Sequence, residues 1–135
     1  MSKLNKSHAY AWTLTGLFAA IHFDLALIPA IPVIGVQGSI SLGLISGPLT
    51  GFLLGPFYGT VAVLIGSFIA VAANPAIAAA GPLTPLATAL GALAAALIRV
   101  ERHRVTTLLY VGVLLLYLLS PIGMIVPLFL WFHLV

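Results

Sequence analysis

The chain has 135 residues, of which 62% are hydrophobic and only 5% are charged. Soluble domains carry about 25% charged residues, so this chain lacks the polar side chains that cover a water-exposed globule. Its formal charge of +3 comes from five basic and two acidic residues, which are too few and too scattered to form a nucleic-acid-binding surface. The composition therefore predicts a multi-pass protein of the cell membrane.

Turn residues and charges divide the apolar sequence into six segments, and a membrane-spanning helix needs about 20 residues, or fewer inside a bundle. We expect helices at residues 8–28, 39–54, 58–73, 84–98, 105–119 and 122–135. Lys3 and Lys6 before the first segment would also suit a secretory signal, but several further apolar segments would remain after its removal. We therefore predict an all-α fold: one transmembrane domain, residues 1–135, forming a polytopic bundle of about six transmembrane helices.

The basic residues predict how this bundle is oriented. All five lie in two places: Lys3 and Lys6 at the start, and Arg99, Arg102 and Arg104 between the fourth and fifth segments. Basic residues are enriched on the cytoplasmic side of membrane proteins. An even number of expected spans separates the two places, so both can lie in the cytoplasm. We expect a cytoplasmic N-terminus, with the first, third and fifth loops outside.

Glycines recur at every fourth position in the second segment and at the start of the third. They are Gly43, Gly47, Gly51, Gly55 and Gly59. Lipid tails are as apolar as leucine, so membrane helices associate through close backbone approach at small residues. We interpret this ladder as a helix-packing surface, with GPFYG at residues 55–59 forming the cytoplasmic turn between the second and third helices.

Small residues also form two faces of the first segment. One face contains Ala11, Thr15, Ala19 and Ala26, and the other contains Thr13, Gly16 and Ala20. One small-residue face is enough to pack this helix against its own bundle. The second face is therefore free for a partner outside the chain.

Polar residues at membrane depth are costly and usually functional. Asp24 lies about 24 Å along the first helix from His8, at about 1.5 Å per residue, close to the outer boundary. Gln37 and Asn74 are expected on the same side, so we predict that Asp24, Gln37 and Asn74 bind a small molecule. Asp24 could equally be an interface residue, and Asn74 could cap a helix end. His22 is rotated by about 200° from Asp24, so we expect a hydrogen-bonded packing residue rather than a His-Asp pair.

The sequence offers no catalytic, metal or cofactor motif. It contains no GxSxG elbow, no HExxH, no paired carboxylates and no Walker A lysine. The four histidines, His8, His22, His103 and His133, are scattered over both predicted sides of the membrane. We therefore expect a protein without enzymatic activity, metal or cofactor.

The stretch from Ser39 to Asn74 combines a small-residue helix, the GPFYG turn and a Gly/Ala-rich helix. It resembles the membrane S components of energy-coupling factor (ECF) transporters, which are six-helix proteins that bind vitamins or other micronutrients. The resemblance implies substrate capture from outside and docking on a transmembrane coupling subunit, and through it on ATPase subunits. The family docks through an A-x-x-x-A pattern in its first helix. The matching row here is Ala11, Thr15 and Ala19, with Thr15 in place of an alanine.

Two other functions fit parts of the pattern. A structural or assembly subunit of a larger membrane complex would use the small-residue faces and bind no ligand. An ion- or proton-coupled carrier would use Asp24 as its titrating group. Carriers usually show internal repeats, which this sequence lacks, so the assembly subunit is the stronger alternative.

Overall fold

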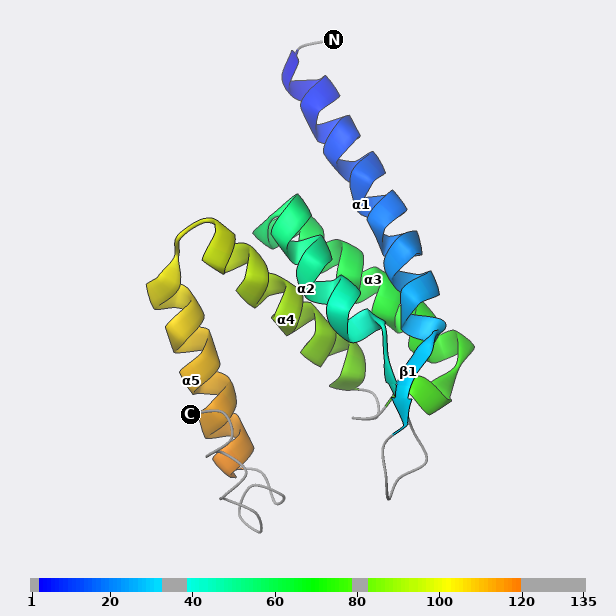
Figure 1. Cartoon of the computed structure of the whole chain (residues 1–135). Helices are drawn as coiled ribbons and strands as arrows, with labels where there is room; N and C mark the ends of the chain where they lie inside the picture. The colour runs from blue at the N-terminus through cyan, green and yellow to red at the C-terminus, as the bar shows by residue number, and fades with distance from the viewer. Residues whose placement is uncertain (1–2, 33–38, 79–82, 120–135) are drawn as a thin grey trace. The chain divides into compact units, whose positions relative to one another are not determined.

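The structure is a computed structural model that describes residues 3–32, 39–78 and 83–119. Its elements are α1 (Lys3–Leu27), β1 (Pro29–Pro32), β2 (Ser39–Ser41), α2 (Gly43–Leu54), α3 (Pro56–Ala73), the 3-10 helix η1 (Pro75–Ile77), α4 (Thr84–Arg99) and α5 (His103–Leu119) (Figure 1). The chain divides into two compact units, Met1–Glu101 and Arg102–Val135. We call them unit 1 and unit 2.

The predicted all-α fold is confirmed within the described residues, which contain five α-helices. The sixth expected helix, at residues 122–135, lies outside them. Two stretches, His8–Leu27 in α1 and Pro56–Ala73 in α3, are long and apolar enough to cross a membrane by length and composition. The helices α2, α4 and α5 are apolar but shorter.

Two short strands that the sequence analysis did not predict follow α1. β1 lies in the expected first loop, whereas β2 takes the place of the start of the helix expected at 39–54, so α2 begins at Gly43. β1 and β2 pair antiparallel, with Ile31 opposite Ile40 and Pro32 opposite Ser39. A proline disfavours the helical conformation of the residue before it, so Pro29 and Pro32 hold this segment extended after α1 ends. The result is a short hairpin rather than an irregular loop.

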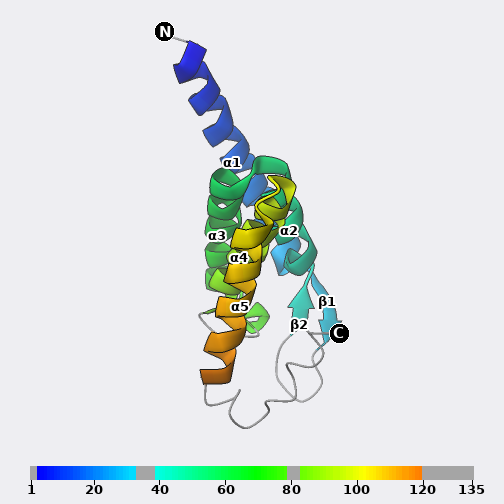
Figure 2. The same ribbon diagram turned by 90° about the vertical axis from the view of Figure 1, so that its left-hand side faces the viewer.

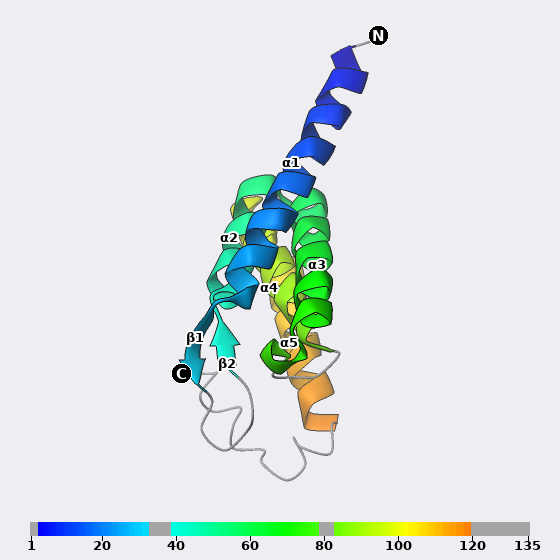
Figure 3. The same cartoon turned by 90° about the vertical axis from the view of Figure 1, so that its right-hand side faces the viewer.

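Unit 1 is a bundle of the four helices α1 to α4. α1 packs along α3, and α2 contacts both α3 and α4. Figures 2 and 3 show these helices side by side, with the hairpin at one end of the bundle and the α2–α3 turn at the other. We call these the hairpin end and the turn end. The first part of α1 extends beyond the turn end of the other helices (Figure 3).

Glycine permits close backbone contact at several places in unit 1, and the closest are at Gly51 and Gly66. A Cβ atom at Gly51 in α2 would overlap the backbone carbonyl of Ala92 in α4. A Cβ at Gly66 in α3 would lie 2.5 Å from the carbonyl oxygen of Ala19 in α1. Such contacts bring helix backbones together where larger side chains would separate them.

The remaining ladder glycines have different surroundings. A Cβ at Gly47 would lie 2.9 Å from Cγ2 of Thr88, and one at Gly59 would lie 2.7 Å from the Cα of Gly51. At Gly43 the nearest atoms belong to Ser41 and Ala26. Gly55 has open space around it but a φ of 87°, a conformation that glycine adopts readily. It forms the turn between α2 and α3 rather than a helix contact.

The interior of unit 1 is small and partly polar, whereas its surface is apolar. Fully buried positions include Ala62, Val63 and Ala92. Large apolar side chains are exposed on every helix of the unit, among them Leu17, Ile45, Phe68 and Leu90. Unit 2 is described through α5 alone, and none of the described α5 residues is buried.

Polar and aromatic side chains gather at the turn end. Trp12 contacts Phe57 and Tyr58 edge to face, with ring centroids 6.1 and 5.5 Å apart. Nδ1 of His8 lies 3.1 Å from the Tyr58 hydroxyl. Arg99 donates to the carbonyl oxygens of Phe52 and Leu53 at the end of α2, at 2.5 and 2.7 Å.

Candidate functional site

A buried histidine joins three helices of unit 1. His22 in α1 has no exposed surface. Its Nδ1 lies 2.7 Å from Oγ of Ser46 in α2, and its Nε2 lies 2.8 Å from Oγ of Ser67 in α3. Ser46 and Ser67 are buried as well. The three side chains form what we call the His22 cluster.

The hydrogen bonds of the His22 cluster form one chain. The Ser46 hydroxyl is oriented to donate to the carbonyl oxygen of Gly43, at the long distance of 3.5 Å. With that orientation, Ser46 accepts from Nδ1–H of His22, and Nε2 accepts from the Ser67 hydroxyl. A neutral imidazole has one donor and one acceptor nitrogen, so this arrangement satisfies both ring nitrogens. No buried side-chain polar atom of the described residues lacks a partner.

A small cavity adjoins the His22 cluster toward the hairpin end. Its volume is about 20 Å³, which is room for about one water molecule. Its polar lining comes from His22, Ser41, Ser67, Thr84 and Thr88. The rest of the lining is Ala26, Gly43, Ala70, Val71 and Ile77. We call this space the His22 cavity.

Elements that connect α1 to α2 and α3 to α4 bound the His22 cavity. Ser41 belongs to β2, and Ile77 belongs to η1. Thr84 is the first residue of α4, and Thr88 follows one turn later with its hydroxyl donating to the Thr84 carbonyl at 2.9 Å. The cavity therefore lies under the hairpin and η1, at the end of the bundle opposite the α2–α3 turn.

Of the three predicted ligand-binding residues, the structure describes Asp24 and Asn74, and neither lines the His22 cavity. Asp24 is exposed on α1 and does not line the His22 cavity. Asn74 is also exposed, and its Oδ1 accepts from the backbone N–H of Ala76 at 3.2 Å, which caps η1. Gln37 lies outside the described residues. The hydrogen-bonded role expected for His22 is present.

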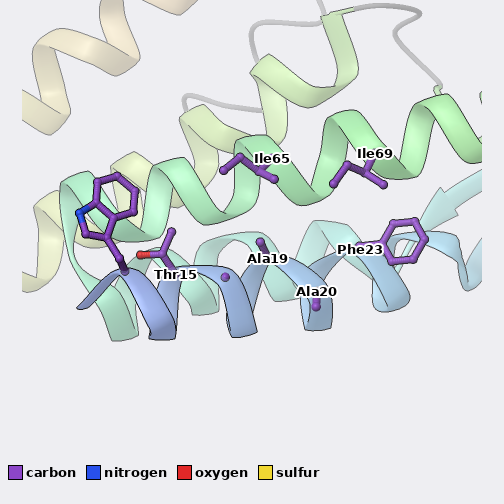
Figure 4. Close-up of a pocket in the computed structure, with 8 residues that line it drawn as sticks. Thr15, Ala19, Ala20, Phe23, Ile65 and Ile69 are labelled. Atoms are coloured by element: carbon purple, nitrogen blue, oxygen red, sulfur yellow. The ribbon is translucent and has the colours of Figure 1, made fainter. Parts of the chain in front are cut away.

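A second feature is an apolar groove between α1 and α3, with a volume of about 370 Å³. It is lined by Trp12, Thr15, Gly16, Ala19, Ala20 and Phe23 from α1 and by Ile65 and Ile69 from α3. Figure 4 shows side chains of the two helices along this groove. We call it the α1–α3 groove.

The two small-residue faces of α1 have different environments. Thr15 and Ala19 are only 2% and 6% exposed, and Ala26 is buried as well. Thr13, Gly16 and Ala20 are exposed. Of the residues predicted to dock on a partner, Thr15 and Ala19 are therefore inside the bundle and Ala11 is half-buried. The face that remains free is the one containing Thr13, Gly16 and Ala20.

The sequence analysis did not predict that Ser46 and Ser67 contact His22, although the positions of the three residues along their helices indicate it. His22 lies near the end of α1, Ser46 near the start of α2 and Ser67 near the end of α3. Consecutive antiparallel helices place such positions at similar depth, within about 10 Å of one end at 1.5 Å per residue. Matching polar residues by depth would have joined the three.

The chain matches no family model, and no curated protein or solved structure matches it significantly.

Proposed function

We propose that this chain is the membrane-embedded substrate-binding component of an ECF-type micronutrient transporter. It spans the cell membrane about six times, with its N-terminus in the cytoplasm. It captures a small molecule from outside and docks on a transmembrane coupling subunit that is powered by separate ATPase subunits. The chain itself catalyses no reaction.

The distribution of side chains in unit 1 supports the membrane location. Soluble monomers rarely expose large continuous apolar patches, yet large apolar side chains are exposed on all four helices of unit 1. Its buried positions include a histidine, two serines and two threonines. Lipid suits the apolar exterior, and interhelical hydrogen bonds suit the polar interior.

The orientation rests on the turn end. Arg99 is fixed there by its contacts with the last carbonyls of α2, and the N-terminal part of α1, with Lys3 and Lys6, extends from the same end (Figure 1). Aromatic side chains gather at membrane interfaces, as Trp12, Phe57 and Tyr58 do here. These features favour a cytoplasmic turn end and an external hairpin end.

The His22 cavity is the observation that carries the transport proposal. It is a polar space at the external end of a bundle whose exterior is apolar. Its present volume admits about one water molecule, so a larger substrate enters when the hairpin and η1 move away from the cavity. The substrate site of the proposal is therefore the His22 cavity, and Asp24 is not part of it.

The exposed small face of α1 is the proposed docking surface for the coupling subunit. Gly16 has no atom within 4 Å of a built Cβ, and Ala20 is exposed beside it in the α1–α3 groove. Small residues allow a partner helix to approach closely. Thr15 and Ala19 support this surface from the inner side, where they hold α1 against α3.

Purification tests the two parts of this proposal separately. Intact protein purified in mild detergent should carry or capture a small molecule that mass spectrometry identifies, and His22→Phe should lose it. Gly16→Leu should keep the molecule but lose copurification with a coupling subunit. Retention of the partner by Gly16→Leu would remove the docking proposal, and absence of any bound molecule would remove the transport proposal.

One observation favours the alternative of an assembly subunit without ligand. Both ring nitrogens of His22 are already paired inside the bundle, which is what a purely structural histidine requires. Under this alternative, a purified wild-type chain captures no small molecule, and Gly16→Leu still abolishes its association with a partner.

A further inference from the structure

We propose that the His22 cavity selects an uncharged molecule that both donates and accepts hydrogen bonds. This inference rests on the proposed function and concerns the class of substrate. It follows from three properties of the hairpin end: the chemistry of the cavity lining, the distribution of charge along the sequence, and the position of Asp24.

The polar lining of the cavity consists of groups that can act in both directions. The hydroxyls of Ser41, Ser67, Thr84 and Thr88 can each donate one hydrogen bond and accept others, although Ser67 is already bonded to His22 and Thr88 to the Thr84 carbonyl. The neutral imidazole of His22 has one donor and one acceptor, which Ser46 and Ser67 occupy, so a ligand bonds to it by replacing one of the serines. A ligand with an alcohol, amide or similar neutral heterocyclic group can therefore exchange bonds with this lining in several arrangements.

The lining contains no formal charge. Among the described residues that bound the cavity there is no Asp, Glu, Lys or Arg. The sequence from residue 25 to residue 98, which includes both outer loops that flank the cavity, also contains none of these four residue types. An ionised ligand buried without a counter-charge or compensating hydrogen bonds is strongly disfavoured, so an anion has no partner here.

Asp24 is the one acidic residue near the hairpin end, and it does not change this conclusion. It lies two positions after His22, about 200° around the helix axis, and its side chain is exposed. His22 points into the bundle, so a regular α1 keeps the Asp24 carboxylate out of the cavity. A cationic ligand would therefore have no carboxylate to pair with inside it.

The apolar part of the lining defines the other side of the ligand. Ala26, Ala70, Val71 and Ile77, which also line the cavity, have hydrocarbon side chains. A molecule that enters once the hairpin and η1 have moved away presents a polar edge to His22 and the hydroxyls and an apolar body to the alanine, valine and isoleucine side chains. Small neutral heterocycles and amides have this character.

The test is capture of ligand from a cell-derived mixture of small molecules below about 1 kDa by the intact purified chain. Bound molecules are released and identified by mass spectrometry, and their charge at pH 7 is assigned from their structure. We expect a neutral molecule whose capture falls at least tenfold in His22→Phe and several-fold in Thr88→Val. Thr88→Val keeps the side-chain shape, so it serves even where His22→Phe does not fold.

Two matched measurements test whether the captured molecule is charged or neutral. Asp24→Asn should capture the same amount as the wild-type chain, and capture should be the same at low and at high salt, because screening weakens only interactions between charges. A captured molecule that is charged at pH 7, or a loss of capture in Asp24→Asn, overturns this inference and leaves the transport proposal standing. Failure of the folded wild-type chain to capture any molecule overturns both.

Discussion

Two helix contacts in unit 1 use small residues in opposite ways. Between α2 and α4, Gly51 lies directly against the backbone of Ala92, and no larger side chain fits between the helices. Between α1 and α3, Gly66 makes a similar contact with Ala19, but alongside this contact the α1–α3 groove stays open at Gly16 and Ala20. Small residues thus bring α2 and α4 into direct backbone contact, whereas between α1 and α3 they leave an open groove that another molecule can enter.

The largest expected loss of stability comes from a substitution in the closed contact between α2 and α4. Gly51→Leu should destabilise the protein by more than about 3 kcal/mol, beyond the usual cost of overpacking, because the backbone of Ala92 cannot move aside as a side chain can. The measurement is the thermal unfolding midpoint and the yield of folded protein in detergent.

Gly16→Leu is the matched control for Gly51→Leu. Gly16 has open space around it, and leucine is the better helix former, so the unfolding midpoint should stay the same or rise slightly. Equal losses in the two variants would show that the open groove and the closed contact are not different environments.

His22→Phe should have the second-largest effect. Phenylalanine roughly fills the space but leaves the Ser67 hydroxyl without its partner and Ser46 with only the long bond to Gly43. We expect a loss of about 2–3 kcal/mol, because each buried polar group left unpaired costs about 1–3 kcal/mol. Ile21→Phe, one residue away on the exposed side of α1, should leave the unfolding midpoint unchanged; an equal loss there would contradict a specific role for the His22 cluster.

Ser67→Ala should cost less, about 1 kcal/mol, because it removes one of the two hydrogen bonds of His22. In the His22→Phe background the same change should cost nothing, because its partner is already absent. A double-mutant cycle measures this coupling. Additive losses in the double variant would mean that the pair does not interact.

Arg99→Gln should have the smallest effect. Arg99 is exposed and donates to the final carbonyls of α2, where a cation stabilises a helix end by about 0.3–1 kcal/mol. Arg104→Gln, at an exposed position of α5, should cause no change in unfolding. If both variants unfold at the wild-type midpoint, the Arg99 contact contributes nothing to stability.

The helices could be predicted because apolar runs, prolines and charges mark their limits in the sequence. Asn74 and Pro75 end α3 as expected, but α3 begins at Pro56, inside the GPFYG stretch that was expected to form the turn, rather than at residue 58. The hairpin could not be predicted, because its two strands are very short and β1 begins and ends with proline. Pairing over so few residues depends on the helices that bring Pro29 and Ser41 together, not on strand propensity.

The candidate site was harder to predict than the helices. The two small faces of α1 are chemically equivalent, so the sequence alone could not decide that Thr15 and Ala19 face α3 while Gly16 and Ala20 stay exposed. The sequence analysis chose Asp24 rather than His22 as a ligand-binding residue because Asp24 is charged. A neutral polar side chain such as that of His22 gives a weaker sequence signal than a carboxylate. It is nevertheless easier to bury between three helices than a charged side chain is.

The separation between His22 and Ser67 has a consequence for biosynthesis. Ser67 follows His22 by 45 residues, so α1 is synthesised before the end of α3. Until α3 is complete, Ser46 is the one serine partner available to the imidazole. Completion of α3 supplies the second hydroxyl, so α1, α2 and α3 can lock together at that step of synthesis.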